Sequence, residues 1–216
     1  MRALIALVIA GCLVVLAPVG GARPSTRKRA AMTPLSFEDA VEKLASPKTR
    51  SDGAAALGAM KDARAVFPLV RAYERRAEGL DVTCLLDALH ATMPRLQPAE
   101  LLAQSKEADD RRALFHAMEL VPEVRWMSVL EQGASESTGK LQKQALRSLA
   151  AQKQTPEWMA SMGRLLDSSS EVVRRQAIES LGRRHQDDAR SLLRARASKE
   201  TDAGLKAALE AALAQP

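Results

Sequence analysis

Histidine side chains are the obvious metal ligands in this chain, and their spacing does not assemble a metal site. His90, His116 and His185 are far apart in the sequence, and none has a second histidine or an acid four residues on. A bound transition metal needs three or four converging ligands. The pattern predicts ordinary helix-surface histidines, and we expect neither a metal nor another cofactor.

Candidate nucleophiles also lack the neighbours that would activate them. No Gly-x-Ser-x-Gly elbow occurs, and the serines at 168–170 suit the start of a helix. Cys84 stands among apolar residues, which predicts an unreactive core thiol. The stretch from Gly53 to Gly58 lacks the Gly-Lys-Ser/Thr ending of a phosphate-binding loop. We therefore expect no catalytic residue, no small-molecule substrate and no enzymatic activity.

A short apolar pattern recurs at nearly constant spacing and predicts the fold. An anchor residue is followed by an apolar residue at +1 and by Leu or Ala at +4. The anchors are Gly53, Leu85, Ala113, Ala145, Ala177 and Ala208, separated by 32, 28, 32, 32 and 31 residues. A fixed period in this range is typical of stacked helical repeats. The prediction is an all-α, right-handed α-solenoid of about five and a half two-helix units.

Two helices are expected in each unit. The first helices are expected near 51–60, 81–92, 109–120, 140–151, 171–184 and 202–214, and the second near 63–77, 98–106, 122–133, 155–166 and 187–197. Ser36 and Asp39 predict the capped start of an earlier helix that covers the open apolar face of the first unit. Gly58 and Gly182 follow the +4 leucine, where a helix must end or pass a neighbour closely.

Proline, serine and tryptophan refine these expectations. Pro98, Pro122 and Pro156 are each expected in a first helical turn, and Ser168 with Glu171 is expected to form a capping box. Trp126 and Trp158 are 32 residues apart on the apolar sides of their helices. Their spacing predicts that they pack between units rather than face a ligand.

An apolar leader precedes the repeats. Residues 1–22 combine Arg2, a long apolar run and small residues before Arg23, which is the layout of a cleavable signal peptide. A retained membrane anchor is the alternative, because about twenty apolar residues can span a bilayer and the four bases that follow would keep the repeats in the cytoplasm. Cys12 also fits a lipobox, but the apolar run continues past it. Residues 23–34 are a basic Pro/Ser linker, and residues 35–216 are the predicted repeat domain.

Residues 170–182 resemble a known repeat family. Their sequence, Ser-Glu-Val-Val-Arg-Arg-Gln-Ala-Ile-Glu-Ser-Leu-Gly, is similar to the small-acidic-x-Val-Arg-x-x-Ala-x-x-Ala-Leu-Gly run of short bacterial HEAT-like repeats of the phycobilisome-lyase type. Residues 54–63 resemble the Ala-Leu-Gly-x-hydrophobic-x-Asp-x-Ala turn of the same family. The resemblance spans roughly 46–216. It implies a protein-binding solenoid whose second helices line the concave side, and it leaves lyase-type and DNA-glycosylase-type enzymes as alternatives.

Charge does not favour nucleic acid as the partner. The chain has 216 residues and a net charge of +6, but five of its 32 bases and none of its 26 acids lie in residues 1–29. The remaining 27 bases face 26 acids, whereas a nucleic-acid-binding domain concentrates bases on its folded surface. Within this nearly neutral body, Arg164, Arg190 and Arg194 fall on second helices. We predict that these three arginines form a partner-binding patch, the alternative being an ordinary solvated helix face.

These observations predict a non-catalytic scaffold or adaptor for a protein partner. The predicted export signal places it in the periplasm or outside the cell, with membrane contact only through a leader that stays uncleaved. The alternative location is an anchor in the inner membrane with the repeats facing the cytoplasm.

Overall fold

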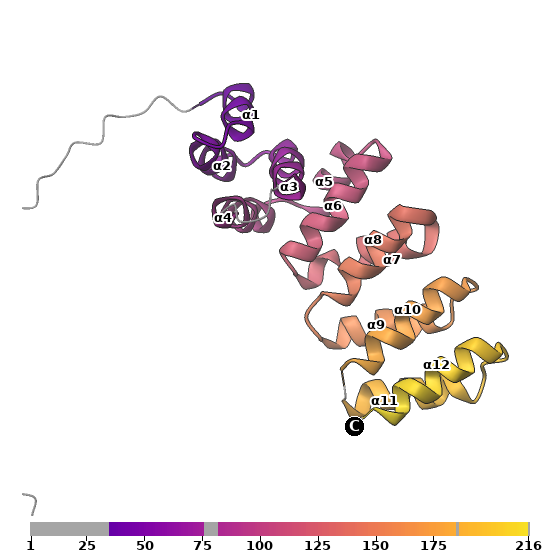
Figure 1. The fold of residues 1–216 in the computed structure, drawn as a ribbon. Coiled ribbons are helices and arrows are strands. Elements are labelled where there is room, and N and C mark those ends of the chain that lie inside the picture. The colour runs from indigo at the N-terminus through magenta and orange to yellow at the C-terminus, as the bar shows by residue number, and fades with distance from the viewer. Residues whose placement is uncertain (1–34, 76–81, 185, 216) are drawn as a thin grey trace, which may run out of the picture. The chain divides into compact units, whose positions relative to one another are not determined.

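Helices account for almost all of the regular structure in the described chain. The computed structural model describes residues 35–75, 82–184 and 186–215, which form twelve α-helices and three short 3₁₀ segments (Figure 1). The helices are α1 (Phe37–Ala45), α2 (Arg50–Ala59), α3 (Val66–Glu74), α4 (Thr83–Thr92), α5 (Pro98–Gln104), α6 (Ala108–Leu120), α7 (Met127–Glu136), α8 (Gly139–Ala150), α9 (Pro156–Leu166), α10 (Glu171–Gly182), α11 (Asp187–Ala197) and α12 (Ala203–Ala214). The 3₁₀ segments are η1 (Ala63–Ala65), η2 (Met93–Arg95) and η3 (Val124–Trp126). The predicted leader and linker lie outside the described residues and stay predictions.

Helix packing confirms the predicted all-α solenoid. The anchored helices α2, α4, α6, α8, α10 and α12 form one layer, and each packs against the helix before it in the chain. Within this layer the spacing alternates. Helix α2 packs closely along α4, α6 along α8 and α10 along α12, whereas α4 and α6, and α8 and α10, approach at only a few positions. By the spacing of its anchored helices the array divides into three blocks, α1–α4, α5–α8 and α9–α12, although α3 also packs on α6 across the first boundary.

Helix starts follow local capping chemistry, with two corrections to the sequence-based expectations. The Oγ of Ser36 accepts the Asp39 N–H at 3.0 Å, and Pro98 and Pro156 occupy first turns, as predicted. The prediction for Pro122 is wrong, because the helical segment begins later, at Val124. The predicted Ser168–Glu171 capping box is also wrong. Ser170 is the residue before α10, and the Oγ of Ser168 accepts the Ser170 N–H instead.

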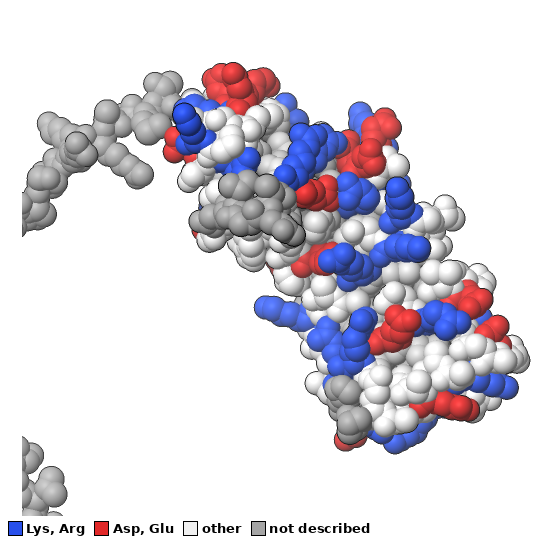
Figure 2. All heavy atoms as spheres, viewed as in Figure 1, with Lys and Arg blue, Asp and Glu red and all other residues white. Residues whose placement is uncertain are grey.

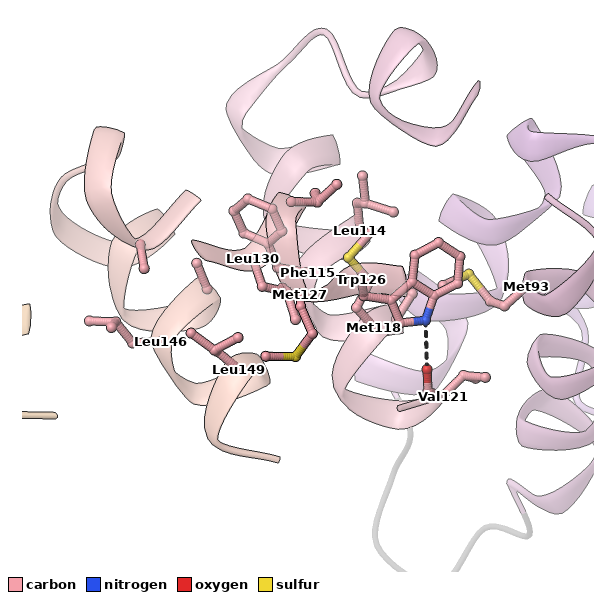
Figure 3. Close-up of a cluster of buried hydrophobic side chains, with 14 of the residues drawn as sticks. Met93, Leu114, Phe115, Met118, Val121, Trp126, Met127, Leu130, Leu146 and Leu149 are labelled. Atoms are coloured by element: carbon pink, nitrogen blue, oxygen red, sulfur yellow. Dashed lines mark hydrogen bonds between the residues drawn. The ribbon is translucent and has the colours of Figure 1, made fainter. Parts of the chain in front are cut away.

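Both tryptophans are fully buried between helices, as predicted. The indole Nε1 of Trp126 donates to the carbonyl of Val121 at 3.0 Å, at the end of α6, and Trp158 donates to Leu149 in α8 at 2.9 Å. Figure 3 shows Trp126 among Met93, Leu114 and other apolar side chains from successive helices. The chain has only three phenylalanines and one tyrosine, so each buried indole fills much of the space between its neighbours.

Glycines allow the closest approaches between anchored helices. A Cβ at Gly58 would lie 3.0 Å from the Cα of Ala88, and one at Gly182 would lie 2.9 Å from the Cβ of Ala212. Both glycines stand at interfaces inside a block, α2 with α4 and α10 with α12. The close passage expected from the sequence at these two positions is confirmed.

Replacing Gly53 with alanine is expected to lower the free energy of unfolding by about 2 kcal/mol, because α1 must shift to accept the methyl group. The new Cβ would lie 2.6 Å from the Ala40 carbonyl oxygen and 2.6 Å from the Leu44 nitrogen, both backbone atoms. Gly163→Ala in α9 is the control, since only a Leu192 methyl lies near its Cβ, at 3.8 Å. It should gain up to about 1 kcal/mol from helix propensity. Urea unfolding of both variants checks this, and equal effects would contradict it.

No helix in the described part of the chain is long and apolar enough to cross a bilayer.

Candidate functional site

A groove opens on the anchored layer where the second and third blocks meet. It has a volume of about 720 Å³ and lies between α8 and α10. Helix α8 contributes Lys143, Leu146 and Arg147, and α10 contributes Val172, Gln176 and Arg183. These residues recur every three, four or seven positions, so each helix presents one stripe to the groove.

The residue after the +4 position differs between the anchored helices. Gly58 and Gly182 hold this position in α2 and α10, where the next anchored helix packs tightly. The equivalent residue of α8 is Ala150, which lines the groove instead of contacting a closely packed neighbour. In α4, the other helix before a block boundary, the equivalent residue is the exposed His90. In α6, however, the equivalent residue is the fully buried Met118, and α6 still packs closely along α8, so the size of this residue alone does not set the spacing.

Positive charge dominates the groove. Four bases, Lys143, Arg147, Arg183 and Arg184, line it with a single acid, Glu119. Figure 2 shows Lys and Arg side chains gathered over the middle of the array, around α8 and α10, with fewer acids among them. Because the repeat domain as a whole is nearly neutral, this excess is a local feature.

Two of the four bases already form hydrogen bonds with neighbouring parts of the array. The Nε of Arg147 donates to Glu119 at 2.8 Å, which links α8 to α6. The Nη2 of Arg184 donates to the carbonyls of Ala150 and Gln152, at the end of α8. Its guanidinium also lies 5.2 Å from the centroid of the Trp158 ring.

Lys143 and Arg183 are the bases left for a ligand. Both are exposed, and neither side chain forms an ion pair with another described residue. Val172 lines the same groove with 51% of its surface exposed, one of two large apolar side chains so exposed in the described chain. The groove therefore offers two free cations beside an apolar contact.

The structure does not bring the three predicted patch residues together in this groove. Arg164, on α9, donates its Nε and Nη2 to Glu131 of α7 at 2.5 and 2.7 Å. Arg190, on α11, donates to the carbonyls of Leu213 and Gln215 at the end of α12. Arg194 is exposed on α11, and none of the three lines the groove. Two of the three arginines thus join helices of the array, and the patch stays a prediction.

Arginine–carboxylate pairs cross several interfaces between helices. The pairs are Arg71–Asp110, Glu74–Arg112, Glu119–Arg147, Glu131–Arg164, Asp167–Arg196 and Glu200–Arg174. The hydrogen bonds from Arg164 lower the pKa of Glu131 against the opposing effect of burial, and a bond from Ser161 adds to them. Burial also acts to raise the pKa of Glu74, but hydrogen bonds from Arg112 and His116 outweigh it and lower that pKa. These paired residues hold the array together.

The histidines and the cysteine considered above as metal ligands or nucleophiles lie apart in the structure. His90 is exposed and donates its Nδ1–H to the Leu86 carbonyl, whereas His116 donates to Glu74 across the α3–α6 interface. The side chain of His185 lies outside the described residues. Cys84 is half-buried against the core. Among the described residues, no three His, Cys, Asp or Glu side chains converge as metal ligands.

A second hollow of about 620 Å³ lies between α9 and α11. Met159, Ala160 and Leu192 form its apolar floor, and Asp188 is its one charged residue. This hollow lacks the free cations of the first groove, so its surface does not indicate a particular class of ligand.

Comparison with known proteins identifies the repeats of the C-terminal half. Residues 125–214, which include α7 to α12, match the family of HEAT repeats. This match includes the 170–182 run from which the resemblance was inferred. No curated protein matches the chain. HEAT repeats typically mediate protein–protein interactions, and a HEAT-repeat helical protein is generally a protein-binding scaffold.

Proposed function

We propose that the chain is a non-catalytic adaptor of the short bacterial HEAT-like type and binds a protein partner in the cell envelope. The observation that carries the proposal is the groove between α8 and α10, where Lys143 and Arg183 are free and Val172 is exposed. Of the other charged side chains that line it, Arg147 and Glu119 pair with each other and Arg184 donates to the carbonyls of Ala150 and Gln152. A rigid array that keeps such a groove open lowers the entropic cost of ordering a partner.

Site-specific photo-crosslinking in the native cells tests the adaptor function. With the photoreactive group at Gln176, inside the groove, we expect one defined partner band. The same group at Arg194 tests the α11 patch predicted from the sequence, and at Val124 it serves as an exposed position outside the groove. A crosslinked band obtained only with the photoreactive group at Arg194 would show that the partner binds at α11 instead of in the groove. No band from either surface would contradict the adaptor function.

The envelope location rests on the predicted leader alone. Mass spectrometry of the purified chain should show a mature protein that begins at Arg23 and is recovered outside the cytoplasm. An intact amino terminus in the membrane fraction would instead support an anchored protein whose repeats face the cytoplasm.

A further inference from the structure

Building on the proposed adaptor function, we infer that the groove between α8 and α10 receives an acidic segment of the partner with an aliphatic side chain among its carboxylates. The inference names the partner's chemistry, which the repeat pattern does not supply. It rests on the charge, the apolar contact and the length of the groove.

Charge complementarity selects an anionic ligand. Lys143 stands on α8 and Arg183 directly follows the facing helix α10, so the free cations belong to opposite walls. Arg147 adds to them, because Glu119 engages its Nε and leaves its side chain 72% exposed. Glu119, the one acid of the groove, already accepts hydrogen bonds from Arg147 and Gln144. An incoming carboxylate thus meets a positive surface whose own acid is already paired.

The apolar contact favours a polypeptide over a nucleic acid. Val172 lies in the stripe that also contains Gln176 and Arg183, and Leu146 and Ala150 line the facing wall. Burying an exposed valine against an aliphatic side chain stabilises a complex, whereas a phosphate backbone gains nothing from it. No aromatic side chain stands among the groove's lining residues to stack on a base.

The length of the groove limits what fits. Val172 stands in the first turn of α10 and Arg183 directly follows its last residue, eleven residues on, or about 16 Å at the helical rise. An extended strand of about five residues covers that distance. A segment with carboxylates on both sides of one leucine or valine would place acids near Lys143 and Arg183 and its apolar side chain near Val172.

Fluorescence anisotropy with the full-length chain tests the inference. The probe is a labelled peptide with four glutamates on each side of one leucine, and the same peptide with glutamine in place of glutamate is the uncharged comparison. We expect the acidic peptide to bind, its affinity to fall with added salt, and the glutamine peptide not to bind. The double variant Lys143→Glu, Arg183→Glu should lower the affinity about tenfold or more.

Matched variants separate the groove from general charge. Lys199→Glu with Lys206→Glu makes the same charge change at exposed positions outside the groove and should change the affinity by less than about twofold, as screened surface charges do. Val172→Ser should weaken binding about threefold through lost apolar contact. Val124→Ser, at the other exposed apolar residue, should leave the affinity unchanged.

Three results would overturn the inference: no binding of the acidic peptide, equal losses in the two double variants, or tighter binding of an eight-phosphate oligothymidine than of the peptide. All substitutions are at exposed positions, and unfolding curves will verify that the variants are folded. If crosslinking captures a partner while the peptide fails to bind, the adaptor function stands and this inference about the groove falls.

Discussion

The Trp158→Ala variant is expected to lose about 4 kcal/mol of unfolding free energy, because a fully buried indole leaves a cavity that the small neighbouring residues cannot fill. The change also removes the hydrogen bond to the Leu149 carbonyl and the contact with the Arg184 guanidinium. Trp158 lies in α9, at the start of the third block, so its loss weakens the junction between α8 and the helices that follow. Urea unfolding followed by circular dichroism measures the effect.

In a stacked array this loss should also change the shape of the transition. Each repeat contacts only its neighbours, so weakening one junction lets the parts on either side unfold separately. We expect a broader curve for Trp158→Ala than for the unmodified chain. A loss below about 1 kcal/mol with an unchanged slope would show that the indole is not a structural junction.

Trp158→Phe provides the matched control. Phenylalanine keeps most of the buried ring but cannot donate to Leu149, so the expected loss is about 1 kcal/mol. Because the chain has two tryptophans, the fluorescence of this variant reports only on Trp126, in the second block. If the blocks unfold together, the unfolding transition that Trp126 fluorescence reports in this variant should coincide with the loss of helix measured by circular dichroism.

A second large effect is expected at Glu200, where substitution by glutamine should cost about 3 kcal/mol. The carboxylate lies between α11 and α12 with 2% of its side chain exposed. It accepts from Arg174 of α10, from Arg196 of α11 and from the N–H groups of Thr201 and Asp202. Neutral glutamine would leave the largely buried guanidinium of Arg174 without an anion and would leave that of Arg196 with Asp167 alone.

The pH dependence of this effect has a definite sign. Hydrogen bonds from Arg196 and from the Asp202 N–H lower the pKa of Glu200 from its ordinary value of 4.5 to about 2. A carboxylate with a lowered folded-state pKa stabilises the fold above its unfolded pKa and loses that contribution as pH falls through the folded value. The stability difference between the unmodified chain and Glu200→Gln should therefore be constant above about pH 5 and shrink as the pH falls from 4.5 towards 2.

Glu210→Gln is the matched control for this experiment. Glu210 is exposed on α12, and its carboxylate has no ion pair with any residue in the described ranges. Glu210→Gln makes the same chemical change ten residues further along the chain without touching the buried cluster, so the stability of this variant should stay within about 0.5 kcal/mol of the unmodified chain. Equal losses at 200 and 210, or a difference that grows towards low pH, would refute the role assigned to Glu200.

The groove and the buried Glu200 cluster have a common origin in the spacing of the blocks. Where α10 packs tightly along α12, Glu200, just before α12, and Arg174 of α10 are largely buried and paired. Where anchored helices stand apart, as α8 and α10 do, charged groups remain exposed and free. The same residue types thus stabilise one interface and offer a binding surface at the next.

Much of the fold could be predicted from the sequence by itself. The period near 32 residues predicted the helices and their stacked order, because helix formation and the apolar stripe depend on residues only three or four positions apart. The burial of Trp126 and Trp158 and the close passages at Gly58 and Gly182 were predicted for the same reason. The two failures, at Pro122 and Ser168, concern helix starts, where the choice of cap depends on how the chain enters the next unit.

Only the tertiary structure decided which charged side chains are free. Arg164 and Lys143 are both exposed bases on helices, but Arg164 meets Glu131, 33 residues earlier, and Lys143 faces the open groove. Glu200 has no signal in the repeat, since the residue one period before it is Ser168. Such pairings depend on the distance and twist between neighbouring helices. These are set by packing along the whole array, and the local pattern does not encode them.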